Sequence, residues 1–408
     1  MVTKAPRPPP HPFLYFVLFL PFGATAGYVM VTIGYLASKA HIPDGTVAAL
    51  VAMNTLPHTW KFLWAPAVDA LWTGRRWYVS TNLVSSAAII ALGFIPITSG
   101  NVGILEVVIF VNGLATTFIG MCTEWLMAHL TPPEQRGRAA GWSQAGNLGG
   151  ATVGGLGLLI AEHTAHAWVP AVVVGSLLLG CSLALLLVEE PPRPDRRGAF
   201  LRDVRDVGRD LWGTVASRGG VLALILCFLP LGAGGAQSLF SAIAGSWRAS
   251  AGLVSVANGL VSGGAAIVGC LIGGRLSDGM DRRGAYALAG VLLAAVAFGM
   301  AFGPRSPVAY AAFVVAYSLV LGICYATFTG FVLEIIGKGA AATKYNVFAS
   351  LSNIPIYYMT RACGWTAQHQ GRTRMLLVDG AAGVVGALLL LVAVALLRRR
   401  KVAPALAA

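Results

Sequence analysis

Charged residues are scarce in this sequence. Asp, Glu, Lys and Arg make up 11% of its 408 residues, against about 25% in an average soluble domain. Acidic residues are the scarcest, with 16 Asp and Glu beside 29 Lys and Arg. So little charge excludes an ordinary soluble domain. The net charge of +13 would suggest nucleic-acid binding only in a soluble protein, and we expect no nucleic-acid partner here.

Cysteine is also sparse, and its pattern indicates neither a disulfide framework nor a metal site. The six cysteines lie inside apolar stretches, and none belongs to a C-x-x-C pair: Cys122, Cys181, Cys227, Cys270, Cys324 and Cys363. We interpret them as packing residues. The sequence also lacks a P-loop lysine after a glycine loop, an H-E-x-x-H helix and a G-x-S-x-G turn. We therefore predict no metal, no cofactor and no enzyme activity.

Apolar residues are abundant: 56% of the chain is hydrophobic, with 50 glycines. A helix needs about 20 apolar residues to cross a bilayer. Twelve runs of suitable length can be counted, at 12–38, 45–70, 76–97, 102–128, 136–161, 167–188, 219–246, 250–275, 284–303, 307–336, 341–367 and 374–397. The sequence therefore predicts an all-α membrane protein with twelve transmembrane helices.

One long polar segment, residues 189–218, divides these runs into two groups of six. It predicts an N-terminal six-helix bundle over 1–188, a cytoplasmic linker, and a C-terminal six-helix bundle over 219–408. The second part of the linker has apolar residues at helical spacing, namely Leu201, Val204, Val207 and Leu211. This spacing predicts an amphipathic helix at the membrane surface.

The two groups of runs repeat each other. Asp69 and Asp278 follow the second run of each half and lie 209 residues apart, and Glu124 and Glu334 near the ends of the fourth runs lie 210 apart. A shared offset predicts two pseudo-symmetric bundles around a central path, which is the organisation of one large class of transporters.

Basic residues indicate the orientation of the chain. With the N-terminus placed inside, the predicted inner segments hold 22 Lys and Arg residues and the outer loops hold 5. Because Lys and Arg collect in cytoplasmic loops, this predicts a multi-pass protein with both termini in the cytoplasm.

The loops after the second and eighth runs resemble the signature loop of the major facilitator superfamily. The second copy has its G-x-x-x-D pattern from Gly274 to Asp278, whereas the first has Ala65 at the glycine position. The resemblance implies a major facilitator fold in which six loop residues act in gating: Asp69, Arg75, Arg76, Asp278, Arg282 and Arg283.

Residues 61–69, which read KFLWAPAVD, carry a narrower resemblance. They are similar to the peptide/acetyl-coenzyme A transporter family, which includes muropeptide permeases and some siderophore permeases. This family usually carries two acidic residues four apart on its fourth helix, but here Gly120 precedes Glu124.

The resemblance implies secondary transport by alternating access, and the cationic residues Lys61 and Arg361 in apolar runs favour a small anionic organic solute. A cell-wall muropeptide is the first candidate and a siderophore the second. We expect proton coupling, a monomer and the bacterial inner membrane. A membrane enzyme and a non-transporting membrane sensor remain alternatives of another class.

Ionisable residues inside apolar runs are costly at bilayer depth and so are candidates for function. Glu124 and Glu334 could carry a proton, or they could pair with loop arginines (Arg75 or Arg76, and Arg282 or Arg283, respectively). Lys61 could attract an anionic group of the substrate or simply pair with a carboxylate. Each residue therefore has one functional and one structural reading.

The candidate substrate-binding residues lie on the predicted first, second, seventh and eleventh helices: Tyr28, Lys61, Gln237, Tyr357, Tyr358 and Arg361. Arg361 offers a planar fork for a carboxylate or phosphate, although a structural arginine capped by the tyrosines is an equal alternative. Other polar residues in apolar runs, among them Gln144, Asn258 and Asn346, are expected to form helix–helix hydrogen bonds. Asp379 is expected near the outer end of the last helix, within reach of water.

Overall fold

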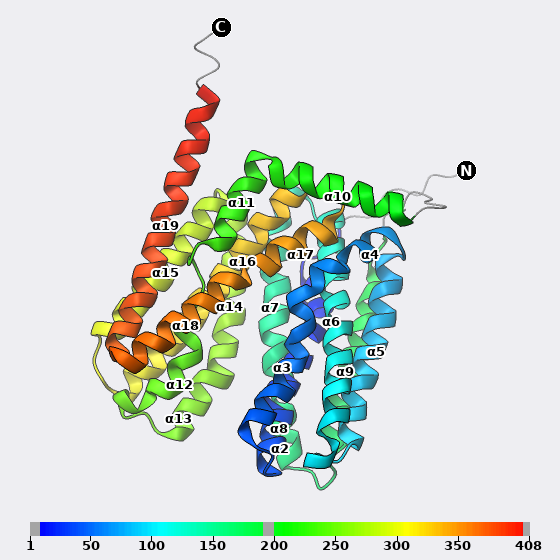
Figure 1. The fold of residues 1–408 in the computed structure, drawn as a ribbon, viewed down its shortest axis with the longest axis vertical. Helices are drawn as coiled ribbons and strands as arrows, with labels where there is room; N and C mark the ends of the chain where they lie inside the picture. The colour runs from blue at the N-terminus through cyan, green and yellow to red at the C-terminus, as the bar shows by residue number, and fades with distance from the viewer. Residues whose placement is uncertain (1–8, 191–199, 403–408) are drawn as a thin grey trace.

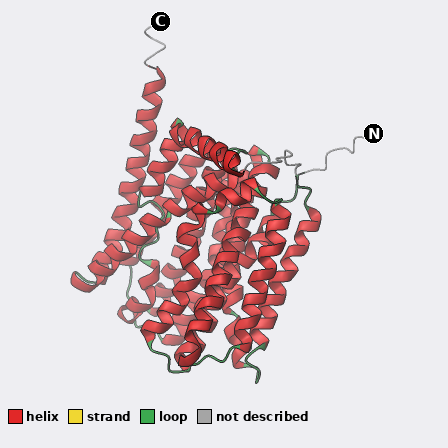
Figure 2. Ribbon diagram, turned by 45° about the vertical axis from the view of Figure 1, so that its right-hand side comes forward, coloured by secondary structure: helices red, strands yellow, loops and turns green. Residues whose placement is uncertain are grey.

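The computed structural model describes residues 9–190 and 200–402, and its regular structure there is entirely helical. Figure 2 shows long helices packed side by side, with no strand in the described ranges. The helix α10 (Phe200–Ala216) crosses one end of the bundle, near both ends of the described chain (Figure 1). This side is called the α10 end below.

The N-terminal half contains six helical segments, several of which are interrupted. In order they are α1–η1–α2 (Phe13–Gly27, Tyr28–Ile33, Gly34–Lys39), α3–η2–α4 (Asp44–Trp60, Lys61–Leu63, Ala65–Ala70), α5 (Gly74–Phe94), η3–α6 (Ser99–Asn101, Val102–Leu130), η4–α7–α8 (Pro133–Gln135, Arg136–Gly155, Gly157–Glu162) and α9–η5 (Val169–Cys181, Ser182–Leu187). Here η denotes a short 3₁₀ or π segment.

The C-terminal half follows α10 and also contains six segments. They are α11 with η6–α12–η7 (Arg218–Phe228, Gln237–Leu239, Phe240–Ile243, Ala244–Trp247), α13–η8–α14 (Ala251–Val256, Ala257–Val261, Ser262–Gly279), α15 (Arg282–Phe302), α16 (Pro307–Ile336), α17–α18 (Ala341–Leu351, Asn353–His369) and α19 (Arg372–Val402).

In the described residues, eight helices are long and apolar enough to span a membrane. The number is nine if the bent pair formed by parts of α10 and α11 is counted as one span. The second, fifth, seventh and eleventh segments are interrupted. For example, Pro57 lies inside α3, and a 3₁₀ turn at Lys61–Leu63 follows it. The twelve apolar runs thus each coincide with a helical segment, and the predicted all-α fold is confirmed.

Close helix approach in the N-terminal half depends on small residues. A Cβ atom at Gly23 would overlap the backbone of Asn147, and one at Gly154 would overlap the backbone of Ala24. These contacts bring α1 against α7, the most extensive helix pair in the described structure. The glycine run around residue 150 therefore serves helix packing, as its small-residue spacing predicts.

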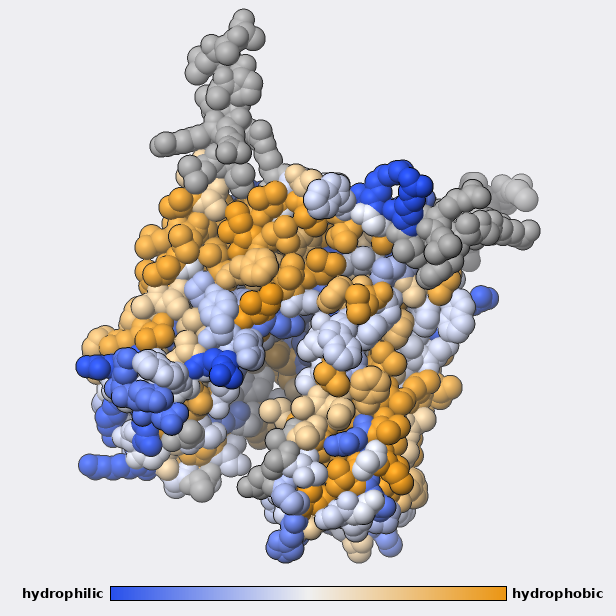
Figure 3. Space-filling model, in the orientation of Figure 1, coloured by the Kyte–Doolittle hydropathy of each residue, from blue (hydrophilic) through white to orange (hydrophobic). Residues whose placement is uncertain are grey.

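The two halves enclose a hollow on one side only. Figure 3 shows a hollow between the two lobes at the end opposite α10. The halves are joined where α7 packs on α14 and α16, and where α17 packs on α4 and α6. The structure is thus sealed at the α10 end and open at the opposite end.

Candidate functional site

A cavity of about 350 Å³ lies between the halves, and its wall combines apolar residues with hydroxyl- and amide-bearing residues, nearly all of them from the C-terminal half. This volume falls within the usual range for ligand sites. Met30 contributes from the N-terminal half. The polar residues of the wall are Gln237, Ser238, Ser241, Asn258, Ser262, Ser318, Tyr325 and Thr360.

Hydrogen bonds within the wall fix its amide groups. Asn258 lies in the π segment η8 and donates to Ser241 Oγ at 2.9 Å and to Tyr310 Oη at 3.0 Å. Gln237 begins η6 and donates to Ser318 Oγ at 3.5 Å. The wall therefore presents preset donors and acceptors, which suit the hydroxyl and amide groups of a sugar or peptide.

Lys61 and Glu124 are two buried ionisable residues of the N-terminal half that lie near each other. Their exposed fractions are 8% and 3%. Lys61 lies in the 3₁₀ turn η2 of the second span, and Glu124 lies on α6. Glu124 also accepts a hydrogen bond of 2.8 Å from Asn346 Nδ2 on α17. The Glu124 carboxylate thus lies near a basic side chain of its own half and accepts a hydrogen bond from an amide of the opposite half.

A second side-chain bond joins the halves close by. Gln144 on α7 donates to Thr329 Oγ1 on α16 at 3.1 Å, and the same hydroxyl lies 3.2 Å from Tyr345 Oη on α17. Gln144 and Asn346 therefore form the helix–helix hydrogen bonds expected of them. Both bonds must break if the halves separate at the α10 end.

Asp69, one of the predicted gating residues, joins the two halves at that end, and its contacts are called the first gate below. It ends the second span and accepts hydrogen bonds from the backbone N–H groups of Ala342 (3.2 Å) and Thr343 (2.8 Å), and from Thr343 Oγ1 (2.8 Å). These groups belong to the first turn of α17, where a helix carries unpaired N–H groups and partial positive charge. Asp69 therefore caps a helix of the opposite half.

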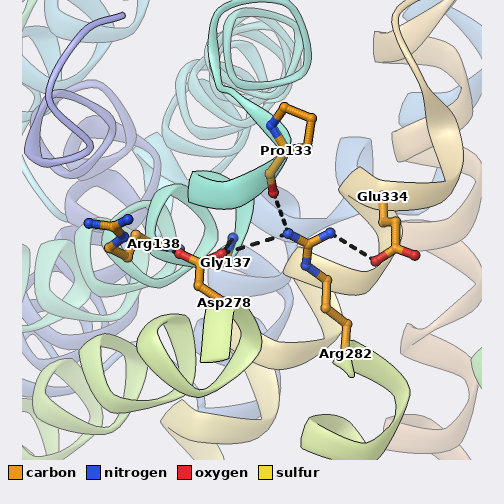
Figure 4. Close-up of polar contacts among 6 residues, drawn as sticks. All are labelled: Pro133, Gly137, Arg138, Asp278, Arg282 and Glu334. Atoms are coloured by element: carbon orange, nitrogen blue, oxygen red, sulfur yellow. Dashed lines mark hydrogen bonds and ion pairs between the residues drawn. The ribbon is translucent and has the colours of Figure 1, made fainter. Parts of the chain in front are cut away.

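Asp278, the equivalent predicted gating residue, joins the two halves in the same way, and its contacts are called the second gate (Figure 4). Its carboxylate accepts from the backbone N–H groups of Gly137 (2.7 Å) and Arg138 (2.9 Å) in the first turn of α7. Arg282 lies 3.7 Å from Asp278, 2.8 Å from Glu334, and donates to the Pro133 carbonyl at 2.6 Å. The two gates are related by the same offset that relates the halves in sequence.

Gly274 explains why the two signature loops differ. A Cβ atom there would lie 2.7 Å from the Gly137 carbonyl oxygen and 2.9 Å from Gly141 Cα, because α14 and α7 cross closely. The equivalent residue of the first gate, Ala65, is fully buried with its methyl group in place. The glycine is therefore needed only at the second gate.

The remaining gating candidates occupy supporting positions. The backbone N–H of Arg75 donates to the Glu190 carboxylate. The backbone N–H of Arg76 donates to Thr73 Oγ1, which caps the start of α5. Arg283 is partly exposed at the start of α15. The predicted linker helix is present as α10, and its Asp210 forms an ion pair of 2.9 Å with the buried Lys344 of α17. Residues 191–199 of the predicted linker lie outside the described residues.

Four predicted substrate residues lie away from the cavity described above. Tyr28 is buried and lines a separate space within the N-terminal half, together with Leu92 and Trp168. Tyr358 donates to the Phe228 carbonyl at 2.9 Å. Tyr357 is 65% exposed, beside the exposed Arg361, whose guanidinium lies 5.9 Å from its ring. Of the six candidates, Gln237 lines the cavity and Lys61 lies beside Glu124.

Two expectations about acidic residues need correction, while a third agrees with the structure. Glu124 contacts Asn346, whereas pairing with Arg75 or Arg76 was the structural alternative. Glu334 pairs with Arg282 at 2.8 Å, as its structural alternative predicts, and its side chain is 45% exposed. Asp379 is only 8% exposed and accepts a hydrogen bond from Tyr317, so it does not reach water as expected.

Two helical halves that surround a one-sided cavity and are sealed by paired gates define a membrane transporter. The family profile described as Major Facilitator Superfamily matches residues 13–359. The chain belongs to the Major Facilitator Superfamily.

Relatives and solved structures agree with this assignment. The anhydromuropeptide permease of Escherichia coli K12 is 28% identical over 357 residues, which cover 82% of this chain and 70% of the permease. The superfamily transporter FucP in the outward conformation has a TM-score of 0.70 at 13% identity and covers 93% of this chain and 97% of its own. The human organic anion transporter MFSD10 has a TM-score of 0.69 at 15% identity, covering 93% and 98%. The last two comparisons show the shared fold.

Proposed function

We propose that this chain is a proton-coupled importer of an anionic cell-wall muropeptide, which it moves through the bacterial inner membrane by alternating access. The observation that carries the proposal is the cavity between the halves, with its amide and hydroxyl wall, together with the buried Lys61–Glu124 pair. A muropeptide offers complementary groups, since it combines sugar hydroxyls, peptide amides and carboxylates. The 28% identity to an anhydromuropeptide permease supports the same substrate.

The cationic Lys61 provides the attraction for the substrate carboxylate in this proposal. Glu124 carries the coupled proton, because its contact with Asn346 exists only while the halves are joined at the α10 end. Glu334, paired with Arg282 at the gate, serves closure. The α10 end faces the cytoplasm, in keeping with the basic residues of the predicted inner loops, so the hollow opens to the periplasm.

Uptake by the purified protein in liposomes tests this function. Labelled anhydromuropeptide is supplied outside, with an inward proton gradient, and accumulation is compared with that in liposomes whose gradient has been collapsed by a protonophore. We expect accumulation above the external concentration only with the gradient. No uptake of the muropeptide under either condition would exclude it as the substrate, and equal accumulation under both would exclude proton coupling.

A further inference from the structure

The seventh span is not one continuous helix. α11 ends at Phe228 and η6 begins at Gln237, and residues 229–236 between them are non-helical. Gly232 and Gly234 have φ angles of +67° and +65°, which other residues rarely adopt. Non-helical backbone at membrane depth persists only where protein or a water-filled cavity satisfies its polar groups. This break must therefore be held by its neighbours.

Tyrosines from two helices hold the beginning of the break. Tyr286 on α15 donates to the Leu231 carbonyl at 2.6 Å, and Tyr358 on α18 donates to the Phe228 carbonyl at 2.9 Å. The Leu231 side chain fills the space above Gly290, and its backbone nitrogen lies 3.0 Å from where a Cβ of Gly386 would be. Gly290 of α15 and Gly386 of α19 thus leave the space that Leu231 occupies.

Asp379 on α19 holds the other end. Its side chain is buried, and its Oδ2 accepts a hydrogen bond of 2.6 Å from Tyr317 Oη on α16. Its Oδ1 lies 3.9 Å from Cys363 Sγ on α18, and the backbone of Gly235 and Ala236 lies near this carboxylate. These two residues directly precede Gln237, so the carboxylate connects α19 and α16 to the point where the seventh span resumes.

The resumed span forms part of the cavity wall. Gln237 and Ser238 both line the cavity, and Ser318, which follows Tyr317 in sequence, accepts the hydrogen bond from Gln237. Asp379 therefore lies between two parts of the cavity wall. It bonds to Tyr317, the neighbour of Ser318 in sequence, and it lies near the backbone that directly precedes Gln237.

We propose that Asp379 is a positioning residue for the substrate site: it does not touch the substrate, but it holds the broken seventh span so that Gln237 and Ser238 face the cavity. The role in substrate recognition rests on the transport function proposed above. The structural part, that this carboxylate places the wall, stands independently and can be tested without a substrate.

Thiol labelling tests the structural part. The six native cysteines are all buried, so a single introduced cysteine can be followed against a low background. Ser238→Cys reports the resumed span, and Met30→Cys reports the same cavity from the opposite half. We expect Asp379→Asn to change the labelling rate of Ser238→Cys by a membrane-impermeant maleimide at least about 5-fold and to leave that of Met30→Cys unchanged. An unchanged rate at Ser238→Cys would overturn the proposal.

Kinetics of uptake test the role in recognition. We expect Asp379→Asn to raise KM about 10-fold with kcat within about 2-fold of the parent, and Tyr317→Phe, which removes one donor, to raise KM about 3-fold. A purely structural role would instead lower the amount of folded protein and kcat, leaving KM unchanged. If Asp379→Asn does not fold, Tyr317→Phe carries both tests. Altered Ser238→Cys labelling in a protein that transports no muropeptide would reject the proposed substrate while supporting the positioning role.

Discussion

At the scale of single residues, Glu124 lies near a residue of each half. Lys61 belongs to its own half, whereas Asn346 belongs to the opposite half. In the proposed mechanism, Asn346 moves away from Glu124 when the α10 end opens. A buried carboxylate that loses a hydrogen-bond donor is less well stabilised as an anion. Binding a proton would remove that cost, and in the proposed mechanism this ties proton uptake to opening of the gate.

We therefore expect Glu124→Gln to abolish uphill uptake, because the amide cannot release a proton, while exchange of substrate across the membrane continues within about 3-fold of the parent rate. Both are measured in liposomes, with and without a proton gradient. Glu334→Gln is the matched control: Glu334 is a gate residue with a half-exposed side chain, and its variant should still accumulate substrate. Undiminished accumulation by Glu124→Gln would refute this role.

The sequence predicts that Lys61 and Glu124 are important, but it does not predict that Asn346 is the hydrogen-bond partner of Glu124. Lys61 and Glu124 stand out because charges in apolar runs are costly. Asn346 could be predicted only as a helix–helix hydrogen bond, since its contact with Glu124 depends on how the two halves meet. Arg361 looked like an anion site for the same reason as Lys61, yet its exposure depends on the rotation of α18, which its sequence does not define.

At the scale of elements, the α10 end is closed by two helix caps that cross between the halves. Asp69 caps α17 and Asp278 caps α7, so each aspartate satisfies N–H groups only in the closed state. A helix cap contributes about 0.5–2 kcal/mol, which corresponds to a shift of about 2- to 30-fold in the balance between two conformations. The caps therefore stabilise the closed gate rather than the fold of either half.

Asp69→Ala and Asp278→Ala should each shift the protein toward the state open at the α10 end. Ser277 is buried where α14 meets Gly137, so labelling of Ser277→Cys reports opening of this end. We expect each variant to speed that labelling about 2- to 30-fold and the double variant to combine the two effects. Asp281→Ala is the control, because Asp281 caps α15 within its own half. Faster labelling in this control too would attribute the effect to general destabilisation.

The sequence predicts that Asp69 and Asp278 have equivalent roles, because they occupy equivalent positions in the repeated loops of the two halves. The break at 229–236 was not, because its apolar and glycine residues fit the pattern of an ordinary membrane helix. What defines the break are partners distant in sequence, such as Tyr286 and Asp379.

At the scale of the whole molecule, the twelve apolar runs and their division by the polar linker predict the bundle, since hydrophobic length is a strong constraint in membranes. The sequence could not predict which end of the protein is open, because the packing inside each half is compatible with both an inward-open and an outward-open arrangement. The structure combines a seal at the α10 end with a hollow at the opposite end (Figures 1 and 3). Alternating access requires that these two features exchange.

Distances between spin labels at both ends test this exchange most directly. Leu71 and Lys338 are exposed residues of opposite halves at the α10 end, and Lys39 and Gln370 are exposed residues of opposite halves at the other end. With anhydromuropeptide at low pH, the account predicts that the distance between labels at 71 and 338 lengthens while that between labels at 39 and 370 shortens. Distances that stay unchanged, or that lengthen together, would contradict alternating access in this protein.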